Sequence, residues 1–115
     1  MIAPLRDRRT LSTVREQGRR GRSGPVTVRH VGSGEGDRCV VAFAIGRRTG
    51  TAVVRNRIRR RLRAALGELL AAGAVPAGAM VISAGAPVAR APFPAVRRDL
   101  ERALVRASTP RPAGA

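Results

Sequence analysis

The segment from Arg55 to Arg63 constrains this chain most, because it combines dense positive charge with the spacing of a buried helix face. Six of its nine residues are arginine. Apolar residues nevertheless recur through and beyond it at intervals of three and four, as in a helix that buries one side. These positions are Val54, Ile58, Leu62, Ala65, Leu66 and Leu69. A disordered basic tail has no use for such a stripe, so we expect a folded helix that offers a cationic face to nucleic acid.

Helical phasing assigns the polar residues of this segment to the opposite side. At about 100° per residue, the outward residues are Asn56, Arg57, Arg59, Arg60, Arg61 and Arg63. Arg55 is expected at the helix start, where its side chain turns outward. Only Glu68 lies nearby to neutralise the cluster, so ion pairs within the chain do not explain it. The turn before the helix brings Arg47 and Arg48 to its N-terminal end, where free backbone N–H groups favour phosphate.

The overall charge also indicates a large anionic partner. The chain has 115 residues and a net charge of +16, and all 23 basic residues are arginine. Residues 1–63 hold 17 of the arginines and only four acids. Self-repulsion at this charge opposes compaction unless an anion offsets it. The length suits a single domain, which we expect over residues 1–106 with a basic arm at 1–9 and a disordered tail at 107–115.

Several other kinds of site are disfavoured by the residue types present. Cys39 is the only cysteine and His30 the only histidine, which excludes a disulfide and Cys-based or His-pair metal sites. We expect Cys39 to be a core thiol and His30 a half-exposed strand residue. The acids are scattered, with Asp7, Glu35 and Asp37 read as solvated loop residues, and form no cluster for two divalent metals. We therefore expect no catalytic residue and no metal ligand in this chain.

The longest uncharged stretch does not indicate a membrane span. Residues 69–89 carry no charge, but glycines and prolines interrupt them. No signal peptide is visible, because arginines break the N-terminus before an apolar region develops. We expect a soluble, cytoplasmic protein with no membrane partner.

The order of local patterns predicts an α-β-β-α-β-α chain. We expect a short helix over Leu11–Gln17 capped by Thr10, a flexible basic connection at 19–24, and strands at 25–31, 38–46 and 79–84. A glycine-rich turn at 32–37 suggests that the first two strands pair antiparallel. The nearly continuous apolar run of the second strand indicates cover on both faces. The arginine-rich helix ends near Gly73, and a last helix runs from Pro94 to about Arg106, with Val96, Leu100, Ala103 and Leu104 inward.

Together these elements predict an α/β (α+β) sandwich on a small mixed sheet in one domain. The strands on either side of the arginine-rich helix should lie parallel, because a helix connects them.

The arginine-rich segment resembles the signature of a known family, the protein subunit of bacterial ribonuclease P. The matching pattern reads Arg47-Arg48-x-Gly50-x-Ala52-Val53-x-Arg55-Asn56-Arg57-Ile58-Arg59-Arg60-x-Leu62-Arg63, without a gap. The resemblance extends more weakly from about Leu5 to Leu104. It implies a protein that binds a catalytic RNA and the 5′ leader of precursor tRNA, and that helps to remove that leader. The RNA, with Mg²⁺ bound mainly to it, would perform the hydrolysis, so the protein is an enzyme subunit without catalytic residues.

The resemblance also implies roles for particular residues. Contacts to the catalytic RNA fall on Arg47, Arg48, Arg55, Asn56, Arg57, Arg59, Arg60 and Arg63. A leader groove between the first helix and the sheet falls on Leu11, Arg15 and Arg29, where the family typically has aromatic residues. A basic pair that often follows the last strand is replaced here by Gly85 and Ala86. The family's strand–helix–strand connection is a left-handed crossover, against the usual preference.

Three other functions are consistent with parts of the pattern. A structural RNA-binding protein of the ribosomal type shares the charge, the size and the sandwich. A helix-turn-helix DNA binder needs two adjacent helices, whereas strands are expected on both sides of the arginine-rich helix, so no DNA partner is expected. A protein-only nuclease would need the acidic cluster that the sequence lacks.

Overall fold

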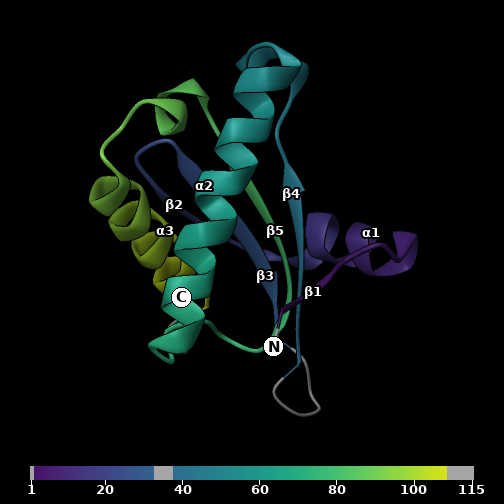
Figure 1. Cartoon of the computed structure of the whole chain (residues 1–115). Helices are drawn as coiled ribbons and strands as arrows, with labels where there is room; N and C mark the ends of the chain where they lie inside the picture. Colours follow the sequence, from purple (N-terminus) through teal and green to yellow (C-terminus); the bar gives the residue numbers. More distant parts are fainter. Residues whose placement is uncertain (1, 33–37, 109–115) are drawn as a thin grey trace.

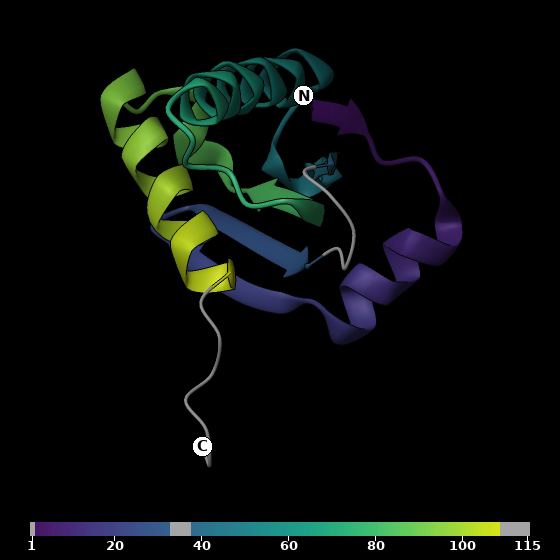
Figure 2. The same cartoon turned by 90° about the horizontal axis from the view of Figure 1, so that it is seen from below.

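The computed structural model describes residues 2–32 and 38–108, which form a mixed sheet between two layers of helices (Figures 1 and 2). The five strands lie in the order β1-β4-β5-β3-β2. Helices α2 and α3 cover one face, and α1 lies on the other (Figure 2). The elements are β1 (Ile2–Pro4), α1 (Arg8–Gln17), β2 (Arg19–Ser23), β3 (Val26–Val31), β4 (Cys39–Ala44), the 3₁₀ turn η1 (Arg47–Thr49), α2 (Ala52–Ala71), β5 (Gly78–Ala84), the 3₁₀ turn η2 (Ala86–Ala89) and α3 (Phe93–Ser108). The predicted α+β sandwich is confirmed.

The main core lies between α2, α3 and one face of the sheet. Ile58 and Leu62 of α2 are fully buried, as are Ala65, Leu66 and Leu69, so the predicted phase of this helix is confirmed. The sheet contributes alternate residues of its three central strands, since side chains of a strand alternate between faces. These residues are Val26, Val28, Cys39, Val41, Met80 and Ile82. From α3 the predicted Val96, Leu100, Ala103 and Leu104 complete the core.

The connection from β4 through α2 to β5 is a left-handed crossover. β4 and β5 are parallel neighbours, with Cys39 opposite Gly78 and Ala44 opposite Ser83, as predicted. In Figure 1 both strands run upward, α2 lies in front of the sheet and β5 lies to the left of β4. A right-handed connection would place the second strand on the right. The handedness implied by the family resemblance is therefore present.

The predicted antiparallel pairing of the first two long strands is wrong. β3 and β4 do run in opposite directions, but β5 lies between them and pairs with both. β5 is the most buried strand and takes the centre of the sheet because both of its faces are covered. β4 was expected to be covered on both faces, yet Ala44 is exposed and Val40 and Ala42 are half-buried. Of the predicted turn at 32–37, residues 33–37 lie outside the described part of the chain.

Two strands were missed in segments that lack strand composition. Within the predicted basic arm, Ile2–Pro4 form β1 and pair parallel with Cys39–Val41. The predicted flexible connection contains β2, which pairs antiparallel with β3 and packs against α3. Gly21 is buried in β2, where a Cβ would lie 2.2 Å from the carbonyl oxygen of Ala103. Only a residue without a side chain allows α3 to approach β2 this closely.

Helix α1 begins earlier than predicted, because Asp7 rather than Thr10 caps it. The carboxylate of Asp7 accepts hydrogen bonds from the N–H groups of Arg9 and Thr10, both at 3.3 Å, and from Thr10 Oγ1 at 2.6 Å. These bonds, the one from the Thr10 hydroxyl foremost, lower the pKa of Asp7. The contribution of the Asp7 cap to folding stability is therefore present above the ordinary pKa of Asp7. It is lost as the pH falls through the lowered pKa. Asp7 was read as a solvated loop acid, and it is exposed but caps a helix.

The only cysteine of the chain, Cys39, and its only histidine, His30, are both buried. Burial raises the pKa of the Cys39 thiol, which agrees with the expected core thiol. His30 was expected to be half-exposed and is instead buried, with Nε2 2.8 Å from the carbonyl oxygen of Ala77. Its strand position faces α2 and α3, as those of Val26 and Val28 do, and the carbonyl supplies the polar partner that burial requires.

Helix α3 extends slightly further than expected. It ends at Ser108, two residues past Arg106, and residues 109–115 of the predicted tail lie outside the described part of the chain. Among the helices that the structure describes, none has the length and apolar content needed to cross a membrane.

Shortening a side chain in the buried stripe of α2 should destabilise the whole domain. Ile58→Ala or Leu62→Ala leaves a cavity in a fully buried site and should lower the free energy of unfolding by about 2–5 kcal/mol. Val53→Ala is the matched control on the same helix, because Val53 is 77% exposed, and it should change stability by less than about 0.5 kcal/mol. Urea unfolding of the three variants measures the difference. Equal losses would contradict the phase of the helix.

Candidate RNA-binding faces

Helix α2 starts one turn earlier than the arginine pattern suggested. Thr51 is its N-cap, and the Thr51 hydroxyl accepts a hydrogen bond from the N–H of Val54 at 3.3 Å. Arg55 consequently lies inside the helix and is half-buried, which corrects its expected place at the helix start. Its Nε is buried and has no hydrogen-bond partner in the described part of the chain.

The arginines of α2 divide into exposed groups and groups held by the protein. Arg60 and Arg63 are exposed, and the Arg60 side chain has no hydrogen bond or ion pair among the described residues. Asn56 is also exposed, and its Oδ1 accepts a hydrogen bond from Arg59 Nη1 at 3.1 Å. This bond restricts the orientation of the Arg59 guanidinium. Asn56 therefore positions a neighbouring arginine of the motif.

Arg57 and Arg61 are hydrogen-bonded to the last residue of η2 and to the segment that follows it. Arg57 Nε donates to the carbonyl oxygen of Ala89 at 2.7 Å, and Arg61 Nη2 donates to that of Ala91. Arg57 is exposed and retains its other N–H groups for a ligand, whereas Arg61 is half-buried. Both side chains therefore hold α2 to the end of η2 and to the segment that leads into α3. The helical periodicity of the sequence placed Arg57 and Arg61 on the outward side of the helix but did not predict these hydrogen bonds.

The single acid near the cluster is engaged elsewhere. Glu68 Oε1 lies 3.3 Å from Arg97 Nε of α3, so its charge is directed at a neighbouring helix. The arginines from Arg55 to Arg63 thus have no carboxylate partner in the described part of the chain.

The turn η1 adds two more arginines at the N-terminal end of α2. Arg47 and Arg48 are both exposed, and their guanidinium groups have no intrachain partner among the described residues. They precede the first turn of α2, where free N–H groups and the helix dipole favour phosphate. We call the predicted RNA-binding residues of η1 and α2 the α2 face. Its members are Arg47, Arg48, Arg55, Asn56, Arg57, Arg59, Arg60 and Arg63, of which Arg55 and Arg59 are half-buried and the others exposed.

The three residues of the predicted leader groove meet on the other side of the sheet. Leu11 packs with the small apolar cluster beneath α1, which contains Leu5, Val14, Ala79 and Val81. Arg15 is exposed on α1, and its carbonyl oxygen accepts a hydrogen bond from Arg29 Nη1 of β3 at 3.2 Å. Arg29 therefore bridges the helix and the sheet.

The sheet surface beside α1 carries small side chains. The strand register aligns Arg29, Val81 and Ala42 in one row, and Thr27, Ser83 and Ala44 in the next. Arg20 and Arg22 of β2 extend these rows at the edge. We call this surface, together with α1, the α1 face. Arg20 and Arg22 were missed by sequence reasoning, because their segment did not read as a strand.

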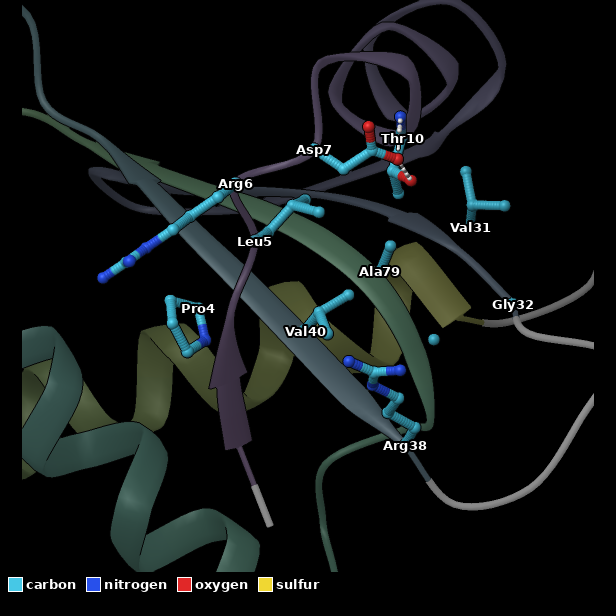
Figure 3. A pocket seen from close by; sticks show the side chains of 11 residues that line it. Pro4, Leu5, Arg6, Asp7, Thr10, Val31, Gly32, Arg38, Val40 and Ala79 are labelled. Atoms are coloured by element: carbon cyan, nitrogen blue, oxygen red, sulfur yellow. Dashed lines mark hydrogen bonds between the residues drawn. The ribbon is translucent and has the colours of Figure 1, made fainter.

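A cavity of about 800 Å³ lies at the start of α1 (Figure 3). Its lining includes Leu5, Val40 and Ala79, and also the arginines Arg6 and Arg38. The sequence contained no motif that marked Arg6 or Arg38, because β1 brings them together only in the folded chain. Among the described residues, no three His, Cys, Asp or Glu side chains form a group that could hold a metal ion.

Comparison with known proteins agrees with this geometry. A family model described as ribonuclease P matches residues 3–108. The chain belongs to the ribonuclease P protein family. It is therefore the protein component of bacterial ribonuclease P, which decides against the ribosomal-type alternative. As a subunit of that holoenzyme, it has an RNA partner.

Solved ribonuclease P proteins share the fold at low sequence identity. The protein from Thermotoga maritima is 23% identical, with a TM-score of 0.77 over 92% of this chain and 98% of that one. The protein from Staphylococcus aureus is 18% identical, with a TM-score of 0.75 over 91% and 94%. The overall α+β architecture is thus one that divergent sequences support.

Arg61 should matter for stability more than for RNA binding. Arg61→Ala removes a charged donor from the carbonyl of Ala91 and should lower the free energy of unfolding by about 1–3 kcal/mol. The salt dependence of RNA binding should stay close to that of the parent protein. Chemical unfolding and filter binding at several salt concentrations measure the two effects. A variant of full stability with a flatter salt dependence would show that Arg61 contacts RNA instead.

Proposed function

We propose that this ribonuclease P protein holds the catalytic RNA with its α2 face and receives the 5′ leader of precursor tRNA on its α1 face. The observation that carries the proposal is that α2 and α1, whose arginines belong to these two faces, lie on opposite sides of one sheet (Figure 2). One protein can then contact two RNA strands at once, and its precursor substrate is held beside the RNA that cleaves it.

The α2 face suits the backbone of a folded RNA. Its arginines present planar donor groups that pair with phosphate oxygens. Arg47, Arg48 and Arg60 have no partner in the described chain, so an RNA would supply the missing anions. Arg59, oriented by Asn56, adds a guanidinium of fixed direction. These contacts depend on charge and geometry and not on base identity.

The α1 face suits a single strand bound through charge. Arg15 and Arg29 lie together with Leu11 beside the small side chains of the sheet, which leave room for bases. Aromatic platforms supply stacking in many single-strand grooves, and these three positions hold none. A guanidinium plane can stack on a base and also pair with phosphate. Leader binding by this protein therefore depends mainly on arginine.

The proposal assigns the phosphodiester hydrolysis and its Mg²⁺ ions to the RNA. The described residues of the chain do not fit a metal centre of their own, since no acidic cluster forms. The side chains of this chain bind and orient RNA and take no part in the hydrolysis. The protein would then act in the cytoplasm, where precursor tRNA is transcribed in bacteria.

Reconstitution tests the function directly. Adding the protein to the catalytic RNA at low Mg²⁺ should raise the rate of cleavage of precursor tRNA. It should also make the holoenzyme bind the precursor more tightly than mature tRNA, because only the precursor has a leader. If the protein neither binds the catalytic RNA nor raises cleavage, the proposal fails. Cleavage by the protein without added RNA would establish a protein-only nuclease instead.

A charge deletion on the α2 face should flatten the salt dependence of RNA binding. Arg60→Ala removes an exposed guanidinium and should reduce the slope of log K against log salt by about 0.7–0.9 for one lost phosphate contact. Its melting temperature should not change. Arg102→Ala is the matched control, because it removes the same charge from an exposed position of α3. An unchanged slope for Arg60→Ala would show that the α2 face does not contact RNA.

A further inference from the structure

A basic cavity lies at the β1 edge of the sheet, on the side of α2. It has a volume of about 720 Å³ and is bounded by β1, β4 and the middle of α2. Its lining residues are Ile2, Ala3, Pro4, Leu5, Arg6, Val41, Ala42, Phe43, Arg59, Arg63, Leu66 and Gly67. All three charged residues in this lining are arginines. The cavity therefore attracts an anion and offers it apolar walls.

One wall of the cavity carries an aromatic ring beneath a guanidinium. Arg63 Cζ lies 5.5 Å from the centroid of the Phe43 ring, which is a cation–π distance. Phe43 is half-buried, and the chain has two phenylalanines but no tryptophan or tyrosine. One of its two aromatic rings thus lines a cavity beside the α2 face. A ring with an adjacent guanidinium is a surface on which a nucleobase stacks.

A second wall is an uncovered strand edge. β1 pairs with β4 only along Cys39–Val41, and the last bond runs from the N–H of Leu5 to the carbonyl of Val41 at 2.9 Å. Alternate residues of a strand direct their N–H and C=O groups to the same edge. The N–H and C=O of Phe43 therefore face this edge beyond the end of β1. They offer one donor and one acceptor to the edge of a base.

A third wall contains Gly67, a position where the surrounding atoms leave room for a side chain. Gly67 lies inside α2, where glycine is less favourable than alanine. A Cβ at this position would meet no atom within 4 Å. The backbone of Gly67 is thus open to the cavity, and its missing side chain widens the space between α2 and β1.

We propose that this cavity holds one unstacked nucleotide of the RNA partner, with its base on Phe43 and Arg63 and its phosphate on Arg59 and Arg6. The inference rests on the proposed function, in which the neighbouring α2 face contacts RNA. Arg6 also lines the cavity at the start of α1, so a strand bound here lies between the two basic faces. A second copy of the chain fits this edge poorly, because two chains of charge +16 repel.

Fluorescence of a single tryptophan tests the site. Phe43→Trp places the only indole of the chain in the cavity. Adding the catalytic RNA should quench and shift its emission, as a base stacks on the ring. A single-stranded hexaribonucleotide should also quench it, and a duplex of the same sequence should not. Unchanged emission while filter binding shows the RNA to be bound would overturn the cavity inference and leave the proposed function standing. Absence of RNA binding by the parent protein would overturn both.

Two further variants separate binding from folding. Phe43→Leu keeps an apolar side chain but removes the ring, and it should weaken binding of the catalytic RNA roughly fivefold or more, the lower bound for one stacked base. Gly67→Ala should raise the melting temperature, because alanine favours the helix, and should weaken RNA binding by narrowing the cavity. Parent-like RNA affinity in both variants would overturn the proposal, as would quenching of the indole only by self-association of the protein.

Discussion

The packing of the apolar stripe of α2 against the sheet is the contact on which the rest of this structure depends. The chain carries a net charge of +16, and in its described part the arginines around Ile58 and Leu62 have no carboxylate partner. Burial of each large aliphatic side chain contributes about 1.5–3 kcal/mol, and that burial offsets the repulsion between the arginines. The same contact sets the rotation of the helix. Because Ile58 and Leu62 face inward, Arg60 faces outward, and Arg59 lies at the border of the buried stripe, where it is half-buried.

The arginines of this ribonuclease P protein fall into two groups, those that bind other parts of the chain and those without a partner in its described part. Arg57 and Arg61 donate to main-chain carbonyls next to α3, and Arg29 donates to the end of α1, so these side chains join elements that are distant in sequence. Arg47, Arg48 and Arg60 have no such partner among the described residues. The first group limits how α2 and α1 sit on the sheet, and the second group is available to RNA. A count of charges does not distinguish the two groups.

The left-handed crossover places the arginine-rich helix on one face of the sheet while α1 lies on the other (Figures 1 and 2). The short strand β1 lies at the edge between them, and Pro4, Leu5 and Arg6 line cavities on both sides. The segment Pro4–Arg6 thus lies between the two RNA-binding faces that the proposed function requires. Its position explains why the cavity beside Phe43 is open, since β1 ends before β4 does.

The sequence by itself determined the phase of α2, the inward residues of α3, the parallel relation of β4 and β5, and the family. Each depends on a local period, a connection length or a contiguous motif, all of which are visible along the chain. Only the tertiary structure decided that β5 separates β3 from β4, that Arg19–Ser23 form a strand and that Asp7 caps α1. It also decided that Arg57 and Arg61 bind carbonyls 30 or more residues away. Strand order and hydrogen-bond partners arise from contacts between segments that are distant in the sequence. The segment of β2, rich in glycine and arginine, forms a strand only because it pairs with β3 and packs against α3.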